Sequence, residues 1–190
     1  DKMTQVDLAS GAYGQTNETT ALELITAYSA AINGGYVVEP YVVDHVIDSS
    51  GNTVLQNTRT VKRQIVSEET SQTMREQLEA VVSSNPSHNA YIQGYRIGGK
   101  TGTAETVSAS GTREKEDYVV SFLGYAPAED PQIAVYVVLN RPNAREQDLE
   151  TRKACIIAKN ILTEVLPYLN IFMTQELTDE ERAELEAMQI

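Results

Sequence analysis

Apolar residues recur at helical spacing in three segments, after Thr20, after Ser67 and over residues 152–166. Thr20 and Ser67 are residues of the type that caps the N-terminus of a helix, and Glu23 would complete a capping box with Thr20. Asn33-Gly34-Gly35 is a sequence that ends a helix. We therefore predict three helices, each with an apolar stripe directed at a core. The predicted stripes are Leu22, Ile25, Tyr28, Ala31 and Ile32; Met74, Leu78, Val81 and Val82; and Ala154, Ile157, Ala158, Ile161, Leu162 and Val165.

Strand-like segments alternate with these helices. Residues 41–48 and 53–56 flank a turn sequence at residues 49–52, which predicts a β-hairpin over about 41–56. Residues 118–126 and 132–139 are almost continuously apolar, and a short turn containing proline joins them. We predict that these two strands are antiparallel neighbours and that both are covered on two faces. The mixture predicts an α+β fold, in which helices flank an antiparallel sheet.

Three other segments are polar. Residues 1–17 contain glycines and predict a loop, and residues 106–117 indicate an irregular excursion between strands. Near the end of the chain, Thr178 and Glu181 have capping-box spacing, which predicts a short acidic helix running to Ile190.

Composition limits the classes of function. The chain has 190 residues, 15 Lys and Arg against 27 Asp and Glu, and a net charge of −12. This charge disfavours nucleic acid or an anionic lipid surface as a partner. Cys155 is the single cysteine, so no intrachain disulfide can form, and its apolar neighbours predict a buried thiol. No apolar run is long enough to span a bilayer and no signal peptide is evident; because the chain starts at Asp1, we expect a processed or truncated N-terminus.

The candidate chemistry lies in Gly98-Gly99-Lys100-Thr101-Gly102-Thr103-Ala104-Glu105. If this segment is a strand, alternation places Thr101 and Thr103 on one face and Lys100 and Gly102 on the other. Two hydroxyl groups can then bind a substrate carboxylate, and the lysine adds positive potential. Gly102 leaves room for a close approach by another group.

This segment resembles the Lys-Thr-Gly strand of penicillin-binding proteins, the serine transpeptidases that cross-link peptidoglycan. The likeness to the class B members extends over residues 89–104 and again over residues 122–127. It implies a partial β-lactamase/transpeptidase-like fold that uses no cofactor and no metal. It also implies that Lys100 and the backbone N–H of Thr103, an oxyanion donor, act in catalysis, and that Thr101, Gly102 and Thr103 bind substrate. An oxyanion donor typically lowers the barrier by about 3–4 kcal/mol.

The rest of the family's catalytic set is absent from the sequence. No serine is followed three positions later by lysine, so the Ser-x-x-Lys box that holds the nucleophile is missing. Ser83-Ser84-Asn85 and Ser87-His88-Asn89 fit the Ser-x-Asn box, but they lie in the loop that leads to the motif, whereas the family's box lies far upstream. We therefore expect residues 1–174 to be the C-terminal portion of a transpeptidase domain that is inactive alone, and residues 175–190 to be an acidic helix.

The resemblance also implies partners and a location. In the intact domain, the serine would form an acyl-enzyme with a stem peptide of peptidoglycan, and β-lactams would acylate the same serine. The parent protein would be anchored by an N-terminal segment at the extracytoplasmic face of a bacterial membrane. The two apolar strands need cover on both faces, and the predicted helices supply it only in part. This predicts a partner, either the missing N-terminal half of the domain or a second copy.

Four alternatives remain open from the sequence. Residues 94–101 also fit the phosphate-binding P-loop pattern, although no apolar strand precedes them and poor helix formers follow. The chain could instead be a non-catalytic module that binds peptidoglycan or β-lactams, a fragment of a serine β-lactamase, or a structural protein with an incidental motif.

Overall fold

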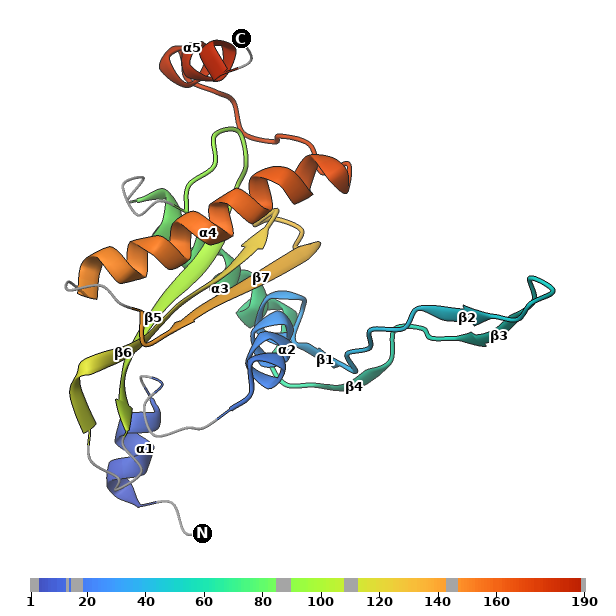
Figure 1. Cartoon of the computed structure of the whole chain (residues 1–190), viewed down its shortest axis with the longest axis horizontal. Coiled ribbons are helices and arrows are strands. Elements are labelled where there is room, and N and C mark those ends of the chain that lie inside the picture. Colours follow the sequence, from blue (N-terminus) through green and yellow to red (C-terminus); the bar gives the residue numbers. More distant parts are fainter. Residues whose placement is uncertain are drawn as a thin grey trace.

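A computed structural model describes residues 4–12, 14, 19–84, 90–107, 113–142 and 147–188. It has an α+β architecture in which helices flank an antiparallel sheet, as the sequence predicts (Figure 1). The elements in chain order are α1 (Gln5–Gly11), α2 (Ala21–Ile32), β1 (Tyr36–Val38), β2 (His45–Ile47), β3 (Thr53–Gln56), β4 (Val61–Gln64), α3 (Glu68–Ser83), β5 (Gly98–Val107), β6 (Arg113–Ala126), β7 (Ile133–Asn140), α4 (Gln147–Tyr168) and α5 (Asp179–Met188).

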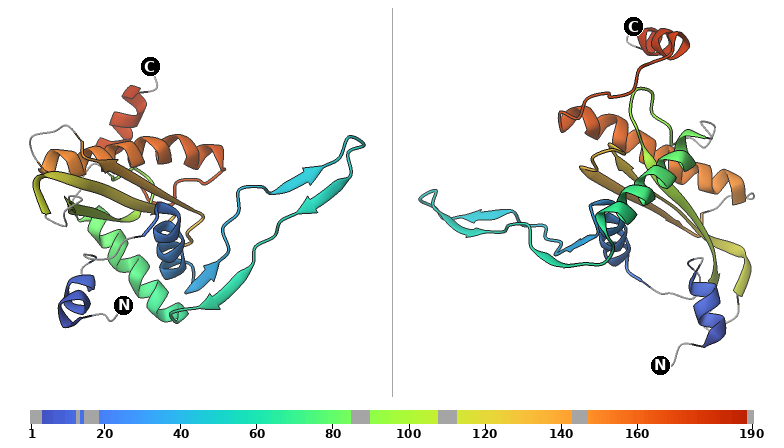
Figure 2. Two further views of the ribbon diagram at one scale, coloured as in Figure 1. Left: turned by 60° about the horizontal axis from the view of Figure 1, so that its bottom comes forward. Right: turned by 180° about the vertical axis from the view of Figure 1, so that it is seen from behind.

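The central sheet has the order β5-β6-β7, and both pairs of neighbours are antiparallel. Helix α4 lies across one face and α3 lies across the other, as the front and rear views show (Figures 1 and 2). Phe122 of β6 belongs to the cluster on the α4 side, whereas Tyr125 packs with Ile32 and Leu78 of α2 and α3. The three-residue separation of Phe122 and Tyr125 explains this division, because alternate strand residues point to opposite faces.

The capping predictions are confirmed. The backbone N–H of Glu23 donates to Thr20 Oγ1 at 3.2 Å, and the N–H of Thr20 donates to Glu23 Oε2 at 2.8 Å. Ser67 caps α3 through the N–H of Thr70. Thr178 and Glu181 form the same reciprocal box at the start of α5. These bonds satisfy backbone donors that a helix N-terminus otherwise leaves without partners.

The predicted apolar stripes are partly wrong. Leu22 is 59% exposed, and the members exposed with it include Met74, Val81, Ile157 and Ile161. One face of the sheet covers only part of each helix, so apolar residues at the edges of a wide stripe remain exposed to water. On α4 the residues that contact the sheet are Ala154, Ala158, Leu162 and Leu166 together with Cys155, which confirms that the thiol is buried. Small side chains here allow the helix to approach the sheet closely.

Two loop predictions are corrected. Residues 5–11 form α1 within the segment predicted as a loop. Strand β5 continues to Val107 and β6 begins at Arg113, so strand structure enters both ends of the predicted polar excursion, and residues 108–112 lie outside the described ones. Antiparallel pairing satisfies backbone groups whatever the polarity of the side chains, so the polar sequence did not reveal these extensions.

The two apolar strands, β6 and β7, differ in how far they are buried. Val120, Phe122 and Tyr125 of β6 are buried, as predicted, but β7 is half-buried and its Val138 is exposed. The reason is position: β6 lies between two strands and two helix layers, whereas β7 is an edge strand of the described sheet.

Residues 36–64 form an arm that projects from the body (Figures 1 and 2). Its base is the antiparallel pair β1 and β4, which the sequence did not predict, and its outer part is the pair β2 and β3. The predicted hairpin is confirmed, but β2 is limited to His45–Ile47. The residues that flank the arm are bonded to each other: the N–H of Ile65 donates to the carbonyl oxygen of Gly35 at 2.8 Å. The two ends of the arm are therefore adjacent.

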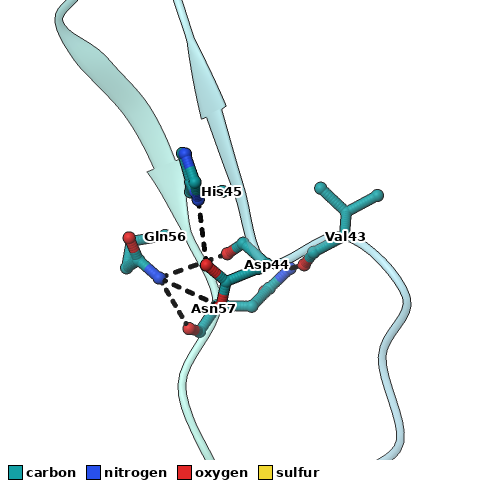
Figure 3. Close-up of polar contacts among 5 residues, drawn as sticks. All are labelled: Val43, Asp44, His45, Gln56 and Asn57. Carbon is teal, nitrogen blue, oxygen red and sulfur yellow. Dashed lines mark hydrogen bonds and ion pairs between the residues drawn. The ribbon is translucent and has the colours of Figure 1, made fainter. Parts of the chain in front are cut away.

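Polar groups hold the outer hairpin at both ends. At its base, the Asn57 side chain donates to the carbonyl oxygen of Val43, and Asp44 Oδ2 lies 2.9 Å from His45 Nδ1 (Figure 3). Gln56 Nε2 donates to the carbonyl oxygens of Asp44 and Asn57. The hydrogen bond with His45 lowers the pKa of Asp44, and the weaker bond from Gln56 Nε2 to Asp44 Oδ1 adds to this shift. At the tip, Asp48 accepts from backbone and side-chain donors of the turn, which lowers its pKa too.

Candidate functional site on strand β5

Strand β5, which carries the sequence motif, lies at an edge of the described sheet. One side of its backbone pairs with β6, in a register that sets Lys100 opposite Leu123 and Thr101 opposite Phe122. The register is unbroken from Gly98 to Glu105. Side chains therefore alternate as predicted, with Lys100 and Gly102 on the face of α2 and α3, and Thr101 and Thr103 on the face of α4.

The motif residues lie at the surface. Lys100 is exposed and its Nζ donates to the carbonyl oxygen of Thr101 at 2.8 Å. Thr101, Gly102 and Thr103 are half-buried. Within the part of the chain that the structure describes, the four ion pairs do not include Lys100. The ammonium group therefore adds positive potential at the edge of the sheet, where an anionic group can approach it.

Glycines allow β5 to lie close to two aromatic rings of β6. A Cβ on Gly98 would overlap the ring of Tyr125, and one on Gly99 would overlap the ring of Phe122. The same ring of Tyr125 packs edge-on against Tyr28, and its hydroxyl donates to the carbonyl oxygen of Arg75 at 2.9 Å. Burial raises the pKa of this phenol, so it remains protonated. These contacts tie the first residues of the motif strand to α2 and α3.

An ion-pair cluster fixes Arg96, two residues before the strand begins. Arg96 donates from two nitrogens to the two carboxylate oxygens of Glu79, each at 2.6 Å, and lies 3.6 Å from Glu129. The hydrogen bond with Glu79 raises the pKa of Arg96 further. Its carbonyl oxygen accepts from the N–H of Ala128 at 2.9 Å. Sequence reasoning missed this cluster, because 17 and 33 residues separate Arg96 from its two acidic partners and no local pattern links them.

Other kinds of chemistry find no support among the described residues. The residues after Thr101 continue β5 as a strand, so the helix that a P-loop requires is missing. Burial raises the pKa of the Cys155 thiol to about 11, which keeps it protonated and a poor nucleophile. Groups of three or more potential metal ligands do not occur among the described residues. Asn85 and residues 87–89, where the two Ser-x-Asn matches lie, fall outside those residues.

A hollow of about 600 Å³ lies away from the motif. Its lining includes Asn33 at the base of the arm, Arg75 of α3 and Asp130 of the β6–β7 turn. It includes none of the motif residues Lys100, Thr101, Gly102 and Thr103. The residues of the motif therefore do not line this hollow. We base the site on the motif, because the hollow is partly open to solvent and is lined by charged residues of both signs. None of the described helices has both the length and the apolar character needed to cross a membrane.

An antiparallel sheet with helices on both faces and a Lys-Thr-Gly edge strand defines the class of the serine penicillin-recognising proteins. Comparison with known proteins identifies the family. The penicillin binding protein transpeptidase domain matches residues 2–163, and the chain belongs to this family.

Two relatives illustrate the similarity. Stage V sporulation protein D of Bacillus subtilis is 39% identical over 172 residues, which are 90% of this chain and 26% of that protein. Penicillin-binding protein PbpB of Mycolicibacterium smegmatis is 31% identical over 137 residues, which are 68% of this chain and 21% of that protein. The chain thus spans about a quarter of the length of the curated relatives it matches.

Solved structures agree with this assignment. Penicillin binding protein 3 of Mycobacterium tuberculosis complexed with ampicillin superimposes with a TM-score of 0.73 at 25% identity, over 86% of this chain and 38% of that one. The D,D-transpeptidase domain of a peptidoglycan glycosyltransferase from Eggerthella lenta gives 0.68 at 30% identity, over 81% and 33%. The partial transpeptidase-like fold that the sequence predicts is therefore confirmed.

Proposed function

We propose that this chain supplies the Lys-Thr-Gly-Thr strand of a peptidoglycan D,D-transpeptidase domain whose nucleophile lies in another segment. The observation that carries this proposal is the edge strand β5, with its exposed Lys100, in a chain of the transpeptidase family. Residues 1–174 would belong to that domain. The sequence contains no Ser-x-x-Lys, so no acyl-serine can form on the family's pattern from these residues alone.

The motif residues would divide the binding of a stem peptide between them. Lys100 would place positive potential beside the serine and the terminal carboxylate of D-Ala-D-Ala. Thr101 and Thr103 would donate hydroxyl hydrogen bonds to that carboxylate, and Gly102 would leave room for the peptide backbone. The N–H of Thr103 would stabilise the negative charge on the carbonyl oxygen during attack. The serine would displace D-Ala, and an amine of a second stem peptide would then displace the serine, which forms the cross-link.

The incomplete cover of the sheet supports a missing partner. Val138 of β7 and Ile156, Ile157 and Ile161 of α4 are large apolar residues that remain exposed. Covering them would stabilise the fold through apolar burial. We propose that the other half of the domain, or failing that a second copy of this chain, covers these residues, which lie on both sides of the sheet. Light scattering should therefore find association of the isolated chain, and a clean monomer would contradict this part of the proposal.

The whole protein would act where peptidoglycan is assembled. We propose that it lies at the extracytoplasmic face of a bacterial cell membrane, held there by an N-terminal anchor. Protease accessibility in intact cells stripped of their wall would test this location, because a cytoplasmic protein would be protected from added protease.

A fluorescent penicillin tests the function. The isolated chain should form no stable adduct, whereas a longer protein that includes the upstream Ser-x-x-Lys box should form one. In that longer protein, Lys100→Ala should slow labelling by about 100-fold or more, as expected for loss of a transition-state contact. Lys62→Ala provides a matched control, because Lys62 is an exposed lysine on the arm. A stable adduct on the isolated chain would refute the proposal, and peptide binding without release of D-Ala would indicate a non-catalytic binding module.

A further inference from the structure

The segment that leads into the motif strand is held by the C-terminal part of the chain. We call residues 91–96 the entry segment and residues 171–188 the C-terminal segment. The two are distant in sequence but in contact along most of their length, and Figure 1 shows the C-terminal helix α5 beyond the entry segment. We propose that the C-terminal segment is a positioning element for β5, and that α5 is its releasable outer part.

The inner contact is a backbone clamp around Gly94. The carbonyl oxygen of Gly94 accepts from the N–H groups of Thr174 and Gln175, at 3.0 and 3.1 Å. Gly94 has φ +78°, and the Met173 side chain covers the position that a Cβ would occupy. A larger residue would meet both the unfavourable backbone conformation and this side chain. The turn at Gly94 is therefore shaped to fit the C-terminal segment.

The next residue extends the clamp toward the strand. Tyr95 is buried, and its hydroxyl donates to the carbonyl oxygen of Ile171 at 3.3 Å. Ile171 is itself buried in the cluster that includes Ile97 and Phe122. A displacement of the C-terminal segment would thus be transmitted to Ile97, which immediately precedes Gly98 and the motif.

The outer contact is of a different kind. Tyr91 Oη donates to Glu181 Oε1 at 2.7 Å, and Gln93 Nε2 donates to Glu184 Oε2 at 2.6 Å. Among its described side chains, α5 has no buried residue, and Glu181 and Leu185 are half-buried. A helix attached by few buried groups opens more easily than the core does. We therefore expect α5 to detach more often than the inner clamp opens, and each detachment removes the Tyr91 and Gln93 bonds that support the entry segment.

Hydrogen exchange on the full chain, resolved to single amides by NMR, tests both parts. Tyr91→Phe removes one hydroxyl and retains the ring, so it should raise exchange in α5 by about tenfold or more, in line with the loss of one hydrogen bond to a charged acceptor. The amide signals of residues 98–103 should also shift. Tyr168→Phe is the matched control, because Tyr168 is 82% exposed. This control should change neither the exchange in α5 nor the amide signals of residues 98–103.

Gly94→Ala probes the inner clamp separately. It should shift the amide signals of residues 98–103 more than Tyr91→Phe does, because it strains the turn itself. If both variants alter exchange only in their own surroundings and leave residues 98–103 as in the Tyr168→Phe control, the C-terminal segment is merely attached and the proposal fails. Faster exchange in α5 without any shift at the motif would equally overturn it.

A second measurement connects the inference to chemistry and rests on the proposed function. In the longer protein with its serine, Tyr91→Phe should lower the rate of penicillin acylation about twofold to fivefold without changing the melting temperature by more than the Tyr168→Phe control does. An unchanged acylation rate would overturn the claim that the C-terminal segment positions β5 for the reaction. If the unaltered protein takes no label, the proposed function fails, and the exchange experiment still decides whether the segment positions β5.

Discussion

The central sheet and the arm are both antiparallel β structure, yet different forces hold them. In β6, Val120, Phe122 and Tyr125 are buried between helices, whereas every residue of β2 and β3 is exposed. Burial of a large apolar side chain contributes about 1.5–3 kcal/mol, whereas a hydrogen bond at the surface contributes about 0.5–1.5 kcal/mol. The motif strand is therefore part of a cooperative core, and the arm depends on local bonds around Asp44, Asn57 and Asp48.

The largest expected effect is the loss of an aromatic core residue. Phe122 is 2% exposed and packs beneath α4, so Phe122→Ala should lower the free energy of unfolding by about 3–5 kcal/mol through lost burial and a cavity. Val54→Ala on the arm should change it by less than about 0.5 kcal/mol, because Val54 is 62% exposed. Urea unfolding followed by circular dichroism measures both, and similar values would abolish the distinction between sheet and arm.

A smaller effect is expected where β5 approaches β6. Gly98→Ala forces a methyl group against the Tyr125 ring, which is anchored by its hydroxyl, and should cost about 1–3 kcal/mol. In Gly102→Ala the nearest obstacle is Ser121 Oγ at 2.8 Å, a small group that can rotate, so the cost should be lower. Unfolding curves of the two variants give the comparison. Equal costs would mean that the aromatic contact does not fix the strand.

Within the arm, the expected effect is local. Asn57→Ala removes the side-chain bond to the carbonyl oxygen of Val43 and should loosen the hairpin by about 1 kcal/mol. Amide exchange in β2 and β3 should then rise about fivefold, while exchange in β6 stays unchanged. Thr58→Ala serves as a neighbouring control, since Thr58 accepts the hydrogen bond from the Thr60 hydroxyl with its backbone carbonyl oxygen, which the substitution retains. A parallel rise in β6 would show that arm and sheet open together.

The smallest expected effect is the response of the hairpin to acid. The pKa values of Asp44 and Asp48 lie below their ordinary value of 3.8, so their contribution to stability is present above that value and is lost as pH falls through the lower folded values. NMR signals of β2 and β3 should therefore change below about pH 4. Asp44→Asn should remove part of that change, and an identical response in the variant would exclude Asp44 as its source.

Sequence reasoning recovered the local features of this fold. Thr20, Ser67 and Thr178 were identified as caps because a cap depends on residues within one helical turn. The motif strand was identified because its residues are adjacent. The apolar pattern also located β6 and β7, because buried strands are nearly continuous in apolar residues.

The remainder depended on tertiary contacts. The direction from which the sheet approaches a helix decides which residues of a wide apolar stripe are buried. On α4, Ala158 is buried and Ile157 is exposed. The bonds from Arg96 to Glu79 and from Tyr91 to Glu181 join residues far apart in sequence, without a local signal. At the site, the types of the motif residues were readable, but the clamp at Gly94 that supports them was not.

The hydrogen bond between Ile65 and Gly35 has a consequence for how this fold can vary. Since the chain leaves and re-enters the body at adjacent backbone atoms, the 29 residues from Tyr36 to Gln64 behave as an inserted cassette. The entropy of closing such a loop grows only slowly with its length. Trimming, extending or exchanging the cassette is therefore compatible with an undisturbed junction between α2 and α3, and this makes it a natural place to graft a reporter or an affinity tag far from the motif strand.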